Sequence, residues 1–251
     1  MKIVFIGSGN AATHLAKALF AAGHLIIQVF SRNVDNATLL AREVGAEPVD
    51  RYPLINTDAD LYLFCVKDDA LQEVILQMPQ TGGVWAHTAG SMPMTLFASR
   101  KEEYGVIYPL QSFSKDRPLH FHHIPLFIEG STTATVRLLE NLALTISHEV
   151  QLLSGDKRGY LHLAAVFACN FVNHMYHLSS EILLKEGIPF KVLRPLIEET
   201  AAKVGEMAPA QAQTGPAVRH DEKVMRNHLL LIGDQRIKEI YSVISNSIQS
   251  T

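Results

Sequence analysis

The feature that most constrains the fold lies at the start of the chain, where residues 2–24 read KIVFIGSGNAATHLAKALFAAGH. The β-branched and aromatic residues at 2–6 predict a buried strand that stops at Gly7. Apolar residues then recur at helical spacing from Asn10, and Gly23 is well placed to end that helix. The chain therefore opens with a strand, a glycine turn and a helix, which is how nucleotide-binding α/β folds begin.

The turn itself matches the pattern G-x-G-x-x-A through Gly7, Gly9 and Ala12. The first glycine permits the tight turn, the second lets a pyrophosphate approach the backbone, and the small third residue lets the helix pack closely on the strand. Free N–H groups and the dipole at the helix N-terminus also favour an anion. The residues predicted to bind a dinucleotide are therefore Gly7, Ser8, Gly9, Asn10, Ala11 and Ala12. The alternative is a glycine turn in an α/β protein that binds no nucleotide.

The end of the second predicted strand indicates which dinucleotide is bound. An NAD site usually carries Asp or Glu there to hold the ribose 2′-hydroxyl. This sequence has Ser31, Arg32 and Asn33 instead, and arginine with small polar groups can pair with a 2′-phosphate. We therefore predict NADP rather than NAD, against the alternative that Arg32 is an ordinary exposed loop residue. Asp35 lies beyond the strand and is expected in the first turn of a helix.

Strand and helix patterns alternate through the first part of the chain. Further strands are expected at 25–30, 60–66, 104–108, 124–129 and 148–152, and residues 82–91 are expected to form another strand and a turn. Helices are expected at 33–45, 69–78 and 131–145. This alternation predicts an α/β fold with a doubly wound, mostly parallel Rossmann sheet.

The strand patterns stop near residue 154, and only helical patterns follow, at 156–186, 190–206 and 221–248. We therefore expect a Rossmann dinucleotide-binding domain over residues 1–153. An all-α C-terminal domain over residues 154–251 would bind substrate and support dimerisation.

Several segments resemble known families. The motifs IGSGNAATHLAKALFAAGH, VFSRN and ADLYLFCVKDDALQEVI resemble the N-terminal domains of pyrroline-5-carboxylate reductase, the coenzyme-F420-dependent NADP oxidoreductases and the 3-hydroxyacid dehydrogenases, over about residues 1–90. The motifs YPLQSFS, HLAAVFACNFVNHMY and TGPAVRHDEKVMRNHLLLI resemble a narrower family of NADP-binding oxidoreductases with a C-terminal helical domain of unknown function. That resemblance spans essentially the whole chain and implies the fold, NADP and a homodimer through the helical domain. It implies no substrate, and the C-terminal signature of the pyrroline reductase is not evident.

Two loops at the carboxyl ends of predicted strands carry candidate residues. The resemblance implies that Val66 and Lys67, after one strand, and the residues from His87 to Ser91, after the next, pass close to the ribose and nicotinamide. Lys67 is interpreted as a cofactor ligand, against an exposed turn lysine. His87 is interpreted as a group that moves a proton, against a packed histidine, and Ser91 as a substrate ligand, against a helix cap.

The long helix predicted at 156–186 carries no charged residue between Arg158 and Glu181. We expect neighbours or a dimer partner to bury it, because a surface helix of that length normally carries charges. Its polar residues interrupt it too often for a membrane span. At about 100° per residue, one face carries five of them, namely His162, Asn170, Asn173, His177 and Ser180.

This polar face suggests a site facing a cofactor cleft. His162 is the candidate proton donor, Asn170 an orienting group, and Asn173 a substrate ligand. The alternative is a set of buried polar groups that lock helix to helix. The lysine that the 3-hydroxyacid dehydrogenases carry on the equivalent helix is missing here, so that chemistry is not carried over unchanged.

Three further segments carry candidates. Arg219 could clamp a substrate carboxylate, with His220 and His228 nearby, or the segment could be a plain junction with Asp221 as helix cap. Tyr108, Gln111 and Ser112 are expected in an extended segment between the domains, with Gln111 as a substrate ligand. The histidines of LHFHHIP at 119–125 offer an alternating pair but no further ligand, so no metal site is predicted.

Composition excludes several classes of protein. The formal net charge is −3 with 22 basic and 25 acidic residues, so no nucleic-acid or membrane surface is expected. The two cysteines, Cys65 and Cys169, make a poor disulfide framework, which indicates a reducing cytoplasm. The first apolar run is too short for a signal peptide.

These observations together predict an oxidoreductase that transfers a hydride between the nicotinamide of NADP and a small carbonyl, imine or hydroxy substrate. Two alternatives stay open, since fold alone does not fix function. One is a regulatory protein that senses NADP without turnover, and the other is a structural dimer with an empty cleft.

Overall fold

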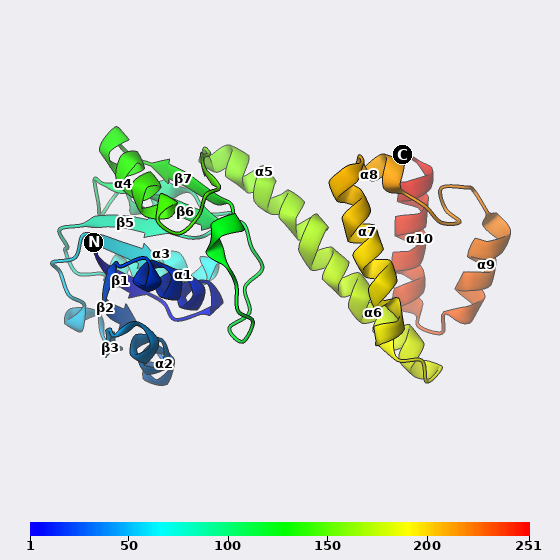
Figure 1. The fold of residues 1–251 in the computed structure, drawn as a ribbon, viewed down its shortest axis with the longest axis horizontal. Helices are drawn as coiled ribbons and strands as arrows, with labels where there is room; N and C mark the ends of the chain where they lie inside the picture. Colours follow the sequence, from blue (N-terminus) through cyan, green and yellow to red (C-terminus); the bar gives the residue numbers. More distant parts are fainter. The chain divides into compact units, whose positions relative to one another are not determined.

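A single eight-stranded sheet organises the first part of the molecule (Figure 1). The computed structural model describes all residues, 1–251. The strands are β1 (Lys2–Ile6), β2 (Leu25–Phe30), β3 (Glu47–Val49), β4 (Leu61–Phe64), β5 (Val84–His87), β6 (Tyr104–Pro109), β7 (Leu126–Gly130) and β8 (Val150–Leu152). They lie in the order β3-β2-β1-β4-β5-β6-β7-β8, and only the β6–β7 pair is antiparallel. The predicted doubly wound, mostly parallel fold is confirmed, with β3 as an additional strand.

Two helical layers cover the sheet because side chains alternate along each strand. One face of β1 carries Ile3 and Phe5, which pack beneath helices α1 (Asn10–Ala21), α2 (Val34–Val44) and α4 (Thr133–Leu144). The opposite face carries Val4 and Ile6, which join the core beneath α3 (Asp68–Gln77). The central strands β1, β4 and β5 are buried on both faces, which explains their nearly continuous apolar sequences.

The only tryptophan, Trp85, lies in the second of these cores and is 1% exposed. Its ring centroid is 5.3 Å from that of Phe64 and 5.8 Å from that of Phe97. Its indole Nε1–H donates to the hydroxyl of Thr81 over 2.7 Å. The aromatic cluster therefore encloses the ring and also satisfies its one polar group.

After β8 the chain becomes entirely helical. One unbroken helical segment consists of α5 (Gly155–Ala165), a π-helical turn (Val166–Phe171) and α6 (Val172–Lys185). This confirms the long helix predicted at 156–186, but the π turn was not foreseen. The molecule divides into two compact units inside that turn, residues 1–169 and 170–251.

This division falls later than residue 153, where the sequence placed the domain boundary. The physical reason is that α5 packs on the sheet. Arg158, near the start of α5, is 1% exposed and bonded to residues of the first unit. The helical pattern alone could not show that its first turns belong to the α/β unit.

The second unit continues from α6 into α7 (Arg194–Glu206), α8 (Pro209–Ala212), α9 (Glu222–Leu231) and α10 (Gln235–Gln249). The prediction of one helix over 221–248 was wrong, because the chain breaks at residues 232–234. Gly233 has a low helix propensity, and the side chain of Asp234 caps α10 by accepting from the backbone N–H of Arg236 and Ile237. Asp221 caps α9, as expected.

Candidate functional site

The two glycines of the first turn meet different surroundings. Gly7 has φ +117°, and a Cβ atom there would lie 2.4 Å from the carbonyl oxygen of Cys65. Gly9 has φ −75°, and no atom lies within 4 Å of the place where its Cβ would be. Gly7 is therefore required by the fold itself, whereas Gly9 leaves space that the protein does not fill.

The N-terminus of α1 opens onto this space. Gly9 is the N-cap residue and has no side chain to cap the helix, and the first turn carries no acidic residue. The N–H groups of Asn10, Ala11 and Ala12 therefore keep no partner within the helix, and the helix dipole adds partial positive charge. Ala12 is fully buried where the helix passes the sheet. These residues fit the phosphates of a dinucleotide in the way that the sequence predicted.

The end of β2 carries the three residues expected to select the cofactor. Arg32 is exposed. Burial raises the pKa of the nearby Tyr52 phenol, and the Glu73 carboxylate raises that pKa further, whereas the positive charge of Arg32 lowers it. Asn33 uses its side-chain oxygen to cap α2 at the N–H of Asn36, and Asp35 lies in the first turn of that helix. No carboxylate takes the place that a ribose ligand has in an NAD site.

The segment after β6 runs along the start of α1. The carbonyl oxygen of Phe113 accepts a hydrogen bond from the Asn10 amide over 2.9 Å, and the ring of Phe113 stacks on His14 at 5.4 Å. Gln111 is exposed and its side-chain oxygen accepts from the N–H of Ser112. Gln111 and Ser112 therefore belong to a segment that hydrogen bonding and ring stacking of Phe113 hold beside the glycine turn.

The loops after β4 and β5 are tied to each other. Ser91 donates its hydroxyl proton to the Asp68 carboxylate, and the N–H of Thr88 donates to the carbonyl of Phe64 over 3.1 Å. Val66 is half-buried, whereas Lys67 is exposed at the N-cap of α3. Because β1, β4 and β5 are parallel neighbours, these loops share one sheet edge with the glycine turn.

His162 reaches this same edge from α5. Its Nδ1 atom lies 3.0 Å from the hydroxyl oxygen of Tyr108, at the end of β6. A Cβ atom at Gly90 would lie 2.7 Å from that Nδ1 and 2.9 Å from a ring carbon of Tyr108. The structure therefore brings the predicted proton donor against the loop after β5.

A buried ion pair holds α5 in this position. Arg158 contacts the Glu129 carboxylate of β7 over 2.5 Å and donates to the carbonyl oxygen of Met92 over 2.7 Å. The second carboxylate oxygen of Glu129 accepts from the N–H of Gly155. Sequence reasoning missed this pair. Its one signal was that Arg158 is the last charged residue before the uncharged stretch that runs to Glu181.

His87 lies in the core rather than at the surface of the edge. It is 0% exposed, and burial, helped by the positive charge of Arg158, lowers the pKa of its imidazole to about 4. Its Nδ1 accepts from the N–H of Ala89, and its Nε2 has no hydrogen-bond partner. A fully buried ring does not touch a substrate, so this geometry favours the alternative of a packed histidine.

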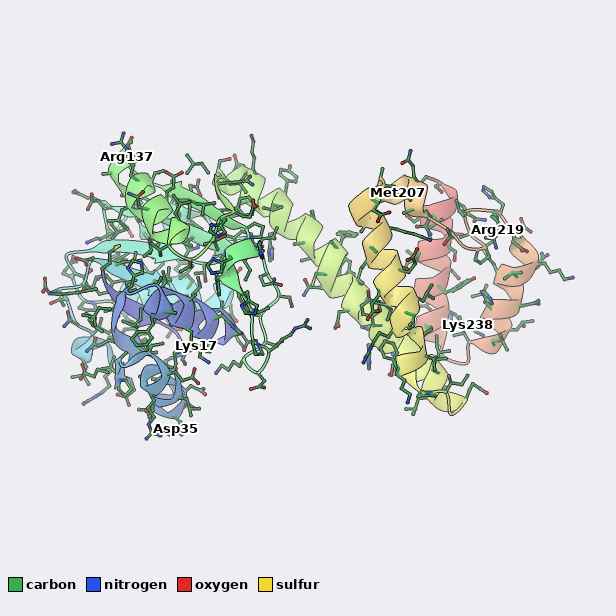
Figure 2. The ribbon with its side chains drawn as sticks, viewed as in Figure 1. Lys17, Asp35, Arg137, Met207, Arg219 and Lys238 are labelled. Carbon is green, nitrogen blue, oxygen red and sulfur yellow. The ribbon has the colours of Figure 1, made fainter.

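The remaining candidates lie in the second unit. Asn170, Asn173 and Arg219 are all exposed there, and Figure 2 labels Arg219 on the segment before α9. His220 beside it has φ +52°, a conformation that non-glycine residues seldom adopt. His228 pairs with the hydroxyl of Tyr241 over 2.9 Å.

The π turn at Val166–Phe171 changes the geometry on which the predicted polar face of the long helix was based. The prediction assumed 100° per residue throughout, whereas a π turn holds more residues and shifts the phase of every later position. The shared face and the functional roles of His162, Asn170 and Asn173 stay predictions.

No group of three or more His, Cys, Asp or Glu side chains is placed to hold a metal ion. None of the helices has both the length and the apolar character needed to span a bilayer.

Comparison with known proteins places the chain. Residues 2–84 match the family described as NADP oxidoreductase, coenzyme F420-dependent, and residues 124–248 match a domain of unknown function, DUF2520. A Bacteroides fragilis protein provisionally described as an NADP oxidoreductase is 45% identical, with a TM-score of 0.93 over 100% of this chain and 98% of its own. No curated protein matches the chain.

Two more distant structures share the fold. A reductive aminase from Aspergillus terreus, in complex with NADPH and ethyl levulinate, has 17% identity and a TM-score of 0.75 over 99% of this chain and 92% of its own. The 1-pyrroline-5-carboxylate reductase of Streptococcus pyogenes has 14% identity and a TM-score of 0.64 over 100% and 99%. The resemblances to the coenzyme-F420-dependent NADP oxidoreductases, to pyrroline-5-carboxylate reductase and to the narrower family with the C-terminal helical domain are confirmed. The chain belongs to the family of NADP oxidoreductases that join a Rossmann-type domain of this kind to a C-terminal DUF2520 domain.

Proposed function

We propose that the protein is an NADP-dependent oxidoreductase. It would reduce a small substrate that carries a C=N or C=O bond, or catalyse the reverse oxidation. The observation that carries this proposal is the glycine turn, where Gly9 leaves open space in front of the uncapped N-terminus of α1. When bound, the cofactor supplies the hydride. The chain supplies phosphate ligands, orientation and a proton.

Arg32 supports the choice of NADP over NAD. Its exposed guanidinium at the end of β2 is free to pair with a 2′-phosphate, and Ser31 is half-buried beside it. The Asn33 side-chain oxygen is already used by α2, so its contribution would come from the remaining amide N–H₂. We assign Gly7 to Ala12, Ser31 to Asn33, Val66 and Lys67 to the cofactor.

His162 is the group that we propose as proton donor. It is half-buried, and it lies against Gly90 at the sheet edge that also carries the glycine turn. Protonation of nitrogen or oxygen must accompany hydride addition to C=N or C=O, and a histidine suits that role near neutral pH. His87 is buried, so we assign it to the support of this edge.

The proposed substrate class is supported by proteins of the same fold. Two proteins of the same fold are named for reactions that produce amines, the reductive aminase and the pyrroline reductase. We propose that an imine or carbonyl compound is reduced, with Ser91 and Gln111 of the first unit as candidate substrate ligands. Ser91 already pairs with Asp68, which would orient its hydroxyl.

A homodimer through the helical domain is also part of the proposal. Apolar side chains of the long helix and of α9 and α10 are exposed in the single chain, among them Leu163 at 53%, Val172 at 37%, Leu230 at 82% and Val243 at 69%. Surfaces of this kind are commonly covered by a partner.

We place the protein in the cytoplasm because both cysteines are unpaired.

The test has two steps. Calorimetric titration with NADPH and then NADH should show tighter binding of NADPH. NADPH consumption is then followed with cyclic imines, with ketones plus amines and with aldehydes. Binding followed by turnover supports the reductase, and loss of turnover in His162→Ala with intact NADPH binding supports the proton donor. NADPH binding without turnover on any compound favours a sensor, and no binding of either nucleotide removes the basis of the proposal.

A further inference from the structure

We propose that Tyr108 is a positioning residue, whose phenol O–H donates to Nδ1 of His162 and thereby fixes the imidazole in the tautomer that carries its proton on Nε2. The inference rests on the proposed function, in which His162 gives its Nε2 proton to the substrate; as it does so the phenol proton of Tyr108 passes to Nδ1, so that the imidazole stays neutral, and water reprotonates the phenolate. Neither the family description nor the named neighbours assign a role to this pair.

The contact involves only one of the two ring nitrogens. The Tyr108 oxygen lies 3.0 Å from Nδ1, and no hydrogen bond to Nε2 is formed within the chain. A neutral imidazole has one N–H donor and one bare acceptor nitrogen. If the phenol donates to Nδ1, the imidazole proton must lie on Nε2, the nitrogen that remains available to a substrate.

The surroundings of the phenol keep it protonated. Tyr108 is 8% exposed, and burial raises the pKa of its hydroxyl. The charged groups that act on it are Arg158 of α5, which opposes the rise, and Asp68 of α3, which adds to it. The phenol therefore keeps its proton at neutral pH and has one to donate.

The position of the His162 ring depends on the space at Gly90 and on the contact with Tyr108. The ring meets Tyr108 nearly edge-on, with centroids 6.0 Å apart and planes at 74°. The absent side chain of Gly90 leaves room for the ring, since a Cβ there would lie 2.8 Å from Cγ of His162. Packing thus sets the position of the ring, while the Tyr108 hydroxyl sets its protonation pattern.

The decisive measurement is the nitrogen NMR spectrum of the His162 imidazole in the protein without added cofactor or substrate. The signals are assigned by comparison with His162→Ala. The proposal expects the Nε2–H tautomer in the wild-type protein at neutral pH. A mixture of tautomers is expected in Tyr108→Phe, which removes the hydroxyl and keeps the ring. Tyr160→Phe is the matched control, because Tyr160 lies on the same helix and is 76% exposed.

Kinetics supply the second readout. Tyr108→Phe should lower kcat about tenfold with KM nearly unchanged, which is the loss expected from one hydrogen bond that orients the donor. Tyr160→Phe should leave both constants as they are. Wild-type protein with the proton on Nδ1, or a Tyr108→Phe spectrum identical to wild type, overturns the inference even if that variant is less stable.

The two proposals fail separately. A tautomer shift in Tyr108→Phe supports the positioning role even if no compound is turned over, because the spectrum requires neither cofactor nor substrate. Turnover that survives His162→Ala would sink the proton-donor assignment, while the spectrum would still decide what Tyr108 does to the ring.

Discussion

The Glu129 carboxylate holds the Arg158 guanidinium at 2.5 Å, although the two residues come from different kinds of element, the end of β7 and the start of α5. The arginine side chain is 1% exposed and that of the glutamate 18%. The positive charge of Arg158 lowers the pKa of His87 and opposes the rise in the pKa of Tyr108. The pair therefore anchors the helix that carries His162.

Breaking this pair should be costly. Arg158→Met leaves a partly buried carboxylate without its opposite charge, and Glu129→Leu leaves a fully buried guanidinium without its own. Each single change should lower the free energy of unfolding by roughly 3–5 kcal/mol. The double variant should lose less than the sum of the two, because no charge is then stranded. Urea unfolding of the four proteins measures this, and simple additivity would contradict the coupling.

The two glycines of the first turn should separate stability from binding. Gly7→Ala forces a Cβ against the Cys65 carbonyl oxygen at positive φ, so unfolding free energy should fall by roughly 3 kcal/mol. Gly9→Ala meets open space, so stability should change by less than about 1 kcal/mol. NADPH affinity of Gly9→Ala should nevertheless fall by at least about tenfold, since the methyl group occupies the phosphate's place. Unchanged NADPH affinity would move the cofactor away from this turn.

Arg32 should set the preference between the two dinucleotides. Arg32→Ala should weaken NADPH binding by about tenfold or more and leave NADH binding nearly unchanged, because only NADPH carries a 2′-phosphate. Arg42→Ala is the matched control, since Arg42 is an exposed arginine in the last turn of α2. Calorimetric titration of both variants gives the ratio of the two dissociation constants. Equal losses for both nucleotides would contradict the assignment.

The buried histidine should make stability depend on pH. The pKa of His87 is lowered from 6.5 to about 4 in the folded protein, so the unfolded chain binds the proton more readily. Its contribution to stability is therefore complete above about pH 6.5 and is lost as pH falls toward about 4. The loss amounts to roughly 3 kcal/mol over that window. His87→Asn keeps an acceptor for the Ala89 N–H but does not titrate there. The difference in unfolding free energy between it and wild type should shrink as pH falls, and a constant difference would argue against the lowered pKa.

The order of strands and helices in the first unit could be predicted because each element carries a strong local pattern. β1 and α1 show this best, since their apolar periods change from continuous to helical at one glycine turn. β3 was missed because three residues around Pro48 carry too little pattern. One helix was predicted over 221–248 because the amphipathic pattern continues across Gly233 and Asp234 and no proline marks the break between α9 and α10.

The site was harder to predict than the fold because it depends on contacts across long stretches of sequence. The glycine turn is local, so its geometry agreed with the pattern. Tyr108 and His162 are 54 positions apart, and their hydrogen bond follows from where β6 and α5 meet. The burial of His87 is also a property of the packed sheet, and no pattern in the neighbouring sequence predicts it.

Because Trp85 is enclosed in the core, it is an intrinsic fluorescence probe of the α/β unit. Because the chain has a single indole and that indole is walled in by aromatic rings of the α/β unit, tryptophan emission comes from one place only. A red shift on denaturation reports the opening of that unit, while the helical unit contributes no tryptophan light. Circular dichroism sees both units, so comparison of the two signals tells whether they melt together or one after the other.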